Sequence, residues 1–145
     1  MIHEEVCTYK VCKLAKEKGF NEKVYHYYQI INKHYCECQG RIEPYIFSFK
    51  LETDDCFTRY NKASEDVISA PTQSLLQRWL REEKDIHISI DYQQGVDEDY
   101  PSYDYSVYRW PINTEAFVQE AWKDGYPTYE LALEDALKYA LENLI

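Results

Sequence analysis

The spacing of the apolar residues changes abruptly at residue 85, and this change is the strongest constraint on the fold. Before it, the run PTQSLLQRWLREE starts with Pro71, a residue type that is favoured in the first turn of a helix. Its apolar residues fall at helical spacing: Leu75, Leu76, Trp79 and Leu80. After it, DIHISIDY alternates isoleucine with polar residues, as a strand with one buried face does. We therefore expect helices packed on a sheet.

The two ends of the chain predict further helices. Apolar positions between residues 4 and 18 lie roughly at helical spacing, and Gly19 follows lysines that suit a helix C-terminus. Near the other end, YPTYELALEDALKYALENLI places Thr128 as a cap before a run rich in alanine and leucine. The predicted helices span about 4–18, 72–84 and 128–144.

The intervening segments favour antiparallel strands. VYHYYQII at 24–31 is rich in β-branched and aromatic residues, and PYIFSFKLE at 44–52 alternates cleanly. Turns at 32–33 and 39–40 would join these strands through HYCEC into a meander. YDYSVYRW at 103–110 predicts a strand that returns from an acidic loop.

Two segments have weaker patterns. Residues 53–70 lack a sustained period and are expected to form a long connection, and residues 113–124 favour a short helix over a strand. No internal repeat or linker divides the chain, so residues 1–145 are predicted to form a single domain. The predicted fold class is α+β, with a mostly antiparallel sheet of about four to five strands and the helices on one face.

The formal net charge of −10 is distributed unevenly. Residues 1–62 hold 10 Lys/Arg and 9 Asp/Glu, whereas residues 63–145 hold 6 and 17. Such a field repels nucleic acid and anionic membranes, so we expect no direct contact with either. The five cysteines are an odd set, and the N-terminus lacks an apolar export signal. These features favour reduced thiols and a cytoplasmic location.

The stretch NKHYCECQG is the one candidate metal site. On a strand, His34, Cys36 and Cys38 would share a face with the two thiols about 7 Å apart, and Cys56 or His26 could supply a fourth ligand. Structural zinc sites, however, space their cysteines by two to four residues in two pairs, and the second pair is missing. We therefore interpret the three as strand residues and expect no cofactor.

Catalytic patterns are not recognised. The four histidines are scattered, and no cysteine has a nearby base that would activate it. The acidic tract VDEDYPSYDY lacks the spacing, glycine and glutamate of a calcium-binding EF-hand. Its carboxylates could instead imitate phosphates, which would make the chain a DNA mimic that inhibits a nucleic-acid-binding protein.

Aromatic residues gather in one predicted hairpin. Tyrosine and tryptophan are enriched at protein interfaces, but they also complete protein cores. The candidates for an interaction surface are Tyr100, Tyr103, Tyr105, Tyr108 and Trp110, with Tyr92 beside them. We expect a non-enzymatic protein that acts through protein contacts, with either a homodimer or another protein as the partner. The DNA mimic and the metal site remain the alternatives.

Three segments together resemble a known group: LAKEKGFNEKVYHYY, APTQSLLQRWLREEKDIHISI and YPTYELALEDALKYALENLI. The chain resembles small uncharacterised proteins of gut anaerobic bacteria and of their phages and mobile elements. The most specific part is the run from Pro71 to Glu82. The resemblance implies a compact domain with a phage or mobile-element background. It carries over no activity and no functional residues.

Overall fold

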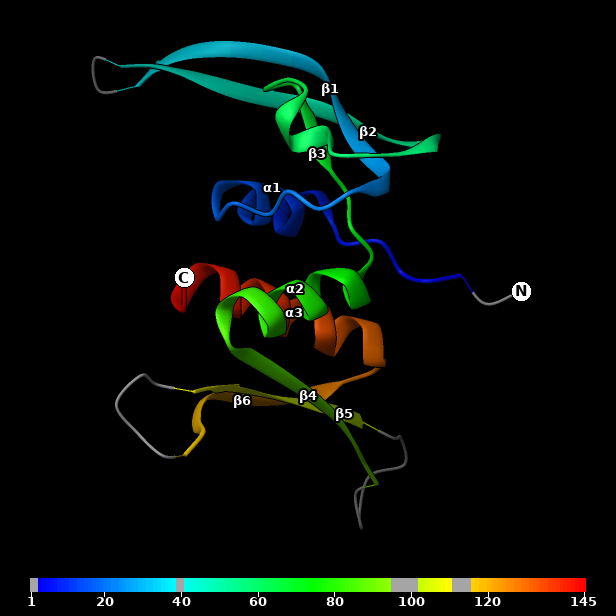
Figure 1. Ribbon diagram of the computed structural model, residues 1–145. Helices are drawn as coiled ribbons and strands as arrows, with labels where there is room; N and C mark the ends of the chain where they lie inside the picture. The colour runs from blue at the N-terminus through cyan, green and yellow to red at the C-terminus, as the bar shows by residue number, and fades with distance from the viewer. Residues whose placement is uncertain (1–2, 39–40, 95–101, 111–115) are drawn as a thin grey trace.

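The computed structural model describes residues 3–38, 41–94, 102–110 and 116–145, with the backbone alone for Asn32 and 34–47 (Figure 1). Three α-helices and six strands lie within these residues, which confirms the α+β class. The helices are α1 (Tyr9–Glu17), α2 (Gln73–Lys84) and α3 (Tyr129–Asn143), with a short 3-10 turn, η1, at Tyr60–Lys62. The strands are β1 (Val24–Cys38), β2 (Arg41–Thr58), β3 (Val67–Ser69), β4 (Ile86–Gln93), β5 (Ser102–Arg109) and β6 (Val118–Tyr126).

The described strands form two antiparallel sheets rather than the single expected sheet. The first has the order β2-β1-β3 and the second the order β4-β5-β6. The helices lie between the sheets, with α1 nearer the first and α2 and α3 nearer the second (Figure 1). No described helix is long and apolar enough to cross a bilayer.

Helix α3 explains why two sheets are needed. Its buried side chains cover about half of its circumference at 3.6 residues per turn: Ala132, Leu133, Ala136, Leu137, Ala140 and Leu141. A helix that is apolar on several sides must be covered on several sides. Helices α1 and α2 and strand β5 contact it, and the resulting core continues from Val24 and Tyr28 of β1 to Ile86 of β4 and Val107 of β5.

The predicted bounds of α2 and α3 are confirmed, whereas α1 begins at Tyr9 instead of about residue 4. The preceding residues are extended, because Val6 forms a β-bridge with Thr72 and the Cys7 amide donates to the Pro71 carbonyl at 3.0 Å. The Thr72 and Thr128 hydroxyls cap α2 and α3, as threonine caps do.

The prediction of a turn at 32–33 was wrong. Strand β1 continues through these residues to Cys38, with shifts of register on both sides of Asn32. A bulge of this kind absorbs an irregular residue without ending the ladder. The expected connection at 53–70 also contains more structure than its pattern indicated, because β2 continues to Thr58 and is followed by η1 and β3.

The prediction of a helix at 113–124 was wrong for its described part. Strand β6 begins at Val118, and residues 113–115 lie outside the described residues. Pairing of β6 with the edge of β5 outweighs the weak helical preference of this segment. Alternation then directs Ala121 towards the core and Trp122, at 55% exposure, to the opposite side of the sheet.

Candidate functional site

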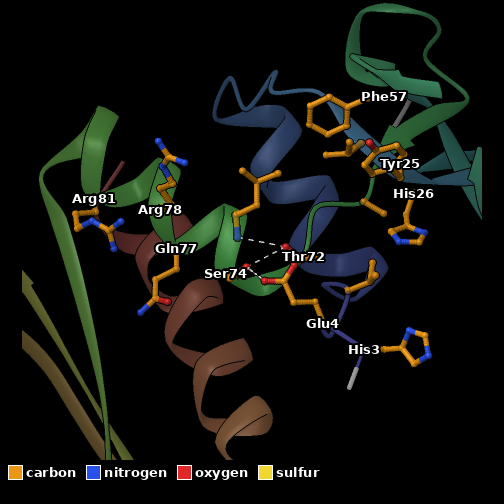
Figure 2. Close-up of a pocket in the computed structure, with 14 residues that line it drawn as sticks. His3, Glu4, Tyr25, His26, Phe57, Thr72, Ser74, Gln77, Arg78 and Arg81 are labelled. Atoms are coloured by element: carbon orange, nitrogen blue, oxygen red, sulfur yellow. Dashed lines mark hydrogen bonds between the residues drawn. The ribbon is translucent and has the colours of Figure 1, made fainter. Parts of the chain in front are cut away.

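A cavity of about 860 Å³ opens between α2 and the first sheet (Figure 2). Arg78 and Arg81 of α2 line one side of it, and Tyr25, His26 and Phe57 line the other. Apolar side chains complete the lining: Val6, Val24, Ala70 and Leu75. The cavity therefore combines guanidinium groups, aromatic rings and an apolar surface.

Several polar groups of the cavity are already bonded within the protein. The Ser74 hydroxyl donates to the Glu4 carboxylate, and the Thr72 hydroxyl accepts from the Leu75 amide at the start of α2 (Figure 2). The Gln77 side-chain amide donates to the carbonyl of Ile88 at 3.0 Å. These bonds fix the first turns of α2 against the N-terminal segment and β4.

The two arginines have donors left over. Arg78 Nε donates to Glu82 Oε1 at 2.9 Å, and this hydrogen bond raises the pKa of Arg78. Arg81 Nη2 lies 4.0 Å from the same carboxylate oxygen. A guanidinium has five N–H donors, so a single carboxylate cannot occupy both groups. Both arginines are partly exposed.

Two aromatic rings form the opposite side of the cavity. The centroids of Tyr25 and Phe57 are 4.8 Å apart with an angle of 35° between the ring planes. The residues are 50% and 49% exposed, so much of each ring can still be covered. His26 lies beside them, and its Nδ1 is 2.9 Å from Thr53 Oγ1.

A second feature is the face of the β4-β5-β6 sheet that points away from the helices. Its side chains alternate with the core residues Ile88 and Val107. We call the following set the outer face: His87, Ser89, Asp91, Asp104, Ser106, Tyr108 and Trp122, with Trp110 and Phe117 at its margin. No helix or strand of the described chain lies against it (Figure 1).

Aromatic rings form a continuous cluster at the margin of the outer face. The Phe117 ring lies 4.8 Å from His87 and 4.9 Å from Trp110, both in edge-to-face geometry. Phe117 and Trp110 are nearly half exposed. Clusters of exposed aromatic rings on a soluble protein mark contact surfaces more often than scattered single residues do.

An acidic pair lies further along the outer face, four residues from His87 on β4. Asp91 and Asp104 are direct cross-strand partners, and like charges at such positions are destabilising. Asp104 is only 5% exposed, and its Oδ2 accepts from Gln93 Nε2 at 3.1 Å and from Trp122 Nε1 at 3.2 Å. Its Oδ1 is buried and has no hydrogen-bond partner among the residues that the structure describes. The pair therefore concentrates negative charge beside Trp122.

The structure divides the aromatic residues that the sequence grouped together. Tyr105 is 4% exposed, packs towards the helices and belongs to the core. Tyr103 and Tyr108 are partly buried and lie on opposite faces of β5, whereas Trp110 is exposed. Tyr100 and most of the acidic tract VDEDYPSYDY lie outside the described residues.

Sequence reasoning missed Phe117 and Trp122. Both fell in the segment for which a helix was expected, and neither was considered as a partner of the β5 aromatic residues. The signal that could have identified Trp122 is its alternation with Ala121 and Lys123 in a short run that ends at Gly125.

The candidate metal ligands lie on β1, where His34, Cys36 and Cys38 pair with residues 45, 43 and 41 of β2. Their side chains are outside the described part of the chain. The proposed fourth ligands are separate: Cys56 is exposed on β2 and His26 contacts Thr53. Among the described residues, no group of three or more His, Cys, Asp or Glu could hold a metal ion.

The thiols of Cys7 and Cys12 are structural. Both residues are fully buried, and burial raises the pKa of each thiol well above its ordinary value. Cys12 Sγ donates to the Cys7 carbonyl at 3.4 Å, and the Tyr28 hydroxyl donates to the same carbonyl at 2.9 Å. A thiol that stays protonated is a poor nucleophile.

The chain matches no protein-family model, no curated protein and no solved structure. The arguments about function therefore rest on the geometry of the cavity and of the outer face.

Proposed function

We propose that this chain is a binding protein rather than an enzyme, and that its outer face contacts a basic surface of a partner protein. The observation that carries the proposal is the set of exposed aromatic residues on the outer face together with the acidic cross-strand pair beside Trp122. Trp122 supplies apolar area and an indole that already contacts Asp104. Aromatic residues that become buried when a partner binds contribute much of the binding free energy of protein interfaces.

The charge of the outer face selects the chemistry of the partner. Asp91 and Asp104 repel each other in the free chain, and a lysine or arginine from a partner would relieve that repulsion. Residues 86–126, which contain the second sheet, hold 8 Asp/Glu and only 2 Lys/Arg. A basic partner would therefore be attracted over a distance and would gain specificity from the match.

The same charge argues against self-association through this face. In a two-fold symmetric dimer the same patch faces itself, so the acidic pairs of both copies would be brought into one interface. A second copy of the chain is thus the less favourable occupant. A partner that uses the same basic surface for DNA would make the chain a DNA mimic, which competition by duplex DNA would reveal.

Affinity capture with matched variants tests the proposal. Immobilised wild-type chain, the face variants Trp122→Ser and Asp104→Asn, and the first-sheet controls Tyr25→Ser and Asp55→Asn are exposed to an extract of the source cells. The captured protein is then purified and titrated against each variant by calorimetry. We expect each face variant to weaken binding about tenfold or more, equivalent to ~1.4 kcal/mol, and the controls to change it less than about twofold.

Asp104→Asn is the more specific test of charge, because the side-chain oxygen of the asparagine can still accept from Trp122 while the negative charge is removed. A partner whose binding is insensitive to both face variants would contradict the proposal. Concentration-dependent sedimentation as a dimer that Trp122→Ser abolishes would also contradict it, because it would assign the outer face to self-association.

A further inference from the structure

We propose that the cavity between α2 and the first sheet binds a small organic anion that carries a flat ring. This site is separate from the outer face, because the second sheet lies on the far side of α2 and α3 (Figure 1). A cavity of about 860 Å³ lies within the range of roughly 300–1,000 Å³ that is usual for small-molecule sites. The inference does not depend on the proposed function.

The hydrogen-bonding groups of the cavity indicate a ligand that supplies acceptors. Gln77 donates to Ile88, and Ser74 is bonded to Glu4, so these polar groups are occupied. Within the described part of the chain, Glu82 is the one residue that pairs with Arg78 and Arg81, which leaves terminal N–H groups of both arginines available to a ligand. Guanidinium groups match carboxylate and phosphate oxygens, which favours an anionic group at this side.

The opposite side of the cavity favours a ring. Tyr25 and Phe57 present adjoining, half-exposed aromatic surfaces. The apolar lining of the cavity includes Val24 of β1 and Leu75 of α2. Aromatic rings stack in offset or tilted geometry and exclude water from each other's surface. A ligand with a flat apolar ring and an anionic group would therefore match both sides of the cavity at once.

The local charges determine how strongly an anion should bind. Glu82 neutralises part of the positive charge of Arg78, with which it forms a helix pair four residues apart, and such exposed pairs are weak. An anion can compete for these guanidinium groups because its other end is held by the rings. Removing the Glu82 charge should therefore strengthen binding, whereas removing the arginines should weaken it.

The test uses two fluorescent probes of nearly the same shape. 1-Anilinonaphthalene-8-sulfonate carries an anionic group, and N-phenyl-1-naphthylamine lacks it. We expect the anionic probe to bind the wild-type chain. Its affinity should fall about tenfold for the double variant Arg78→Gln/Arg81→Gln and rise about threefold for Glu82→Gln. The affinity of the uncharged probe should change less than about twofold in all of these variants, because its ring contacts are retained.

Further arms locate the site and distinguish the sources of the anion. Tyr25→Ser should weaken the binding of both probes, whereas Trp122→Ser on the outer face should leave the binding of both unchanged. Displacement of the anionic probe by adenosine monophosphate but not by adenosine would indicate a nucleotide, and displacement by indole-3-acetate would indicate an aromatic carboxylate. The proposal is overturned if the anionic probe does not bind the wild-type chain, or if its affinity is the same for the double arginine variant. It is also overturned if Trp122→Ser abolishes binding of the probe. Circular dichroism checks that the exposed substitutions leave the fold intact.

Discussion

The two sheets lie on opposite sides of the helices, the first against α1 and the second against α2 and α3, and they differ in strand length and in charge. In the first, β1 and β2 have 15 and 18 residues and β3 has only 3, whereas the strands of the second have 8 or 9. Residues 24–69, which contain the first sheet, hold 5 Lys/Arg and 7 Asp/Glu, whereas residues 86–126, which contain the second, hold 2 and 8. The two sides of the molecule thus carry different surfaces: a cavity to which α2 contributes two arginines, and an acidic aromatic face.

The largest expected effect concerns whether the two sheets unfold together. Leu137 of α3 is fully buried in the core that joins them, so Leu137→Ala should lower the free energy of unfolding by about 3 kcal/mol. Urea denaturation followed by both near-ultraviolet circular dichroism and tryptophan fluorescence should give one coincident transition. Leu131→Ala, at an exposed position of the same helix, should cost less than about 0.5 kcal/mol. Separate transitions for the two signals would show that each sheet folds independently.

A smaller effect should follow from the carboxylate that holds the helices together. Glu134 Oε1 accepts from the amide of Thr8 at 2.8 Å and from its hydroxyl at 2.6 Å, and Oε2 accepts from Gln73 Nε2 at 2.9 Å. Glu134→Gln should cost about 2 kcal/mol, because charge-assisted hydrogen bonds are lost between α3 and the N-terminal ends of α1 and α2.

The control for this variant is Glu142→Gln, since Glu142 makes only a 3.9 Å ion pair with Lys10 at the surface. It should change the free energy of unfolding by less than about 0.5 kcal/mol in the same urea experiment. Equal effects of the two variants would mean that the Glu134 contacts contribute nothing beyond a surface charge.

Alkaline pH should weaken both halves of the molecule. Burial raises the pKa of Tyr28 in the first sheet and of Tyr126 in the second to about 12, whereas an unfolded tyrosine ionises near 10. The folded state keeps these protons longer, so their contribution is complete below about pH 10 and is lost as the pH rises towards 12. Unfolding by urea at several pH values should show this fall, and Tyr126→Phe should reduce it.

Absorbance at alkaline pH provides an independent check. Ultraviolet titration of the wild-type chain should show a late-ionising group of tyrosines that includes Tyr28 and Tyr126, and this group should lose one member in Tyr126→Phe. Ionisation of Tyr28 and Tyr126 near pH 10 in the folded protein would contradict the burial that raises their pKa.

The smallest predicted effects are those of the helix caps. The Thr72 hydroxyl accepts from the Leu75 amide at 3.3 Å, and the Thr128 hydroxyl accepts from the Leu131 amide at 3.2 Å. Thr72→Ala and Thr128→Ala should each cost about 1 kcal/mol in urea unfolding. Thr128→Ser should restore most of the loss, since serine caps as well as threonine, and failure of this rescue would show that the methyl group matters more.

Local sequence patterns predicted the parts of the fold that depend on local chemistry. The bounds of α2 and α3 follow from Pro71, the two threonine caps and apolar spacing, and the alternation of isoleucine identified β4. The division into two sheets could not be predicted in this way, because it depends on how many sides of α3 are buried by distant segments.

The functional surfaces depend even more on distant contacts. Arg78 and Phe57 are 21 residues apart in the sequence and line the same cavity only because the fold places α2 and the end of β2 on its two sides. Likewise, Asp91 and Asp104 become partners only through the β4–β5 register, and Trp122 joins them only once β6 is recognised as a strand. Trp110, by contrast, was identified from the sequence as a candidate for an interaction surface, and it is exposed in the structure.

Hydroxyl-radical footprinting of the chain, free and bound to the captured basic partner, tests the central claim most directly. Trp110, Phe117 and Trp122 are exposed in the free chain, as are Tyr25 and Phe57 at the cavity, whereas Trp79 is buried and serves as an internal reference. The account predicts that the partner slows oxidation of the three outer-face residues and leaves Tyr25 and Phe57 unchanged. Protection of Tyr25 and Phe57 with continued oxidation of Trp122 would contradict it.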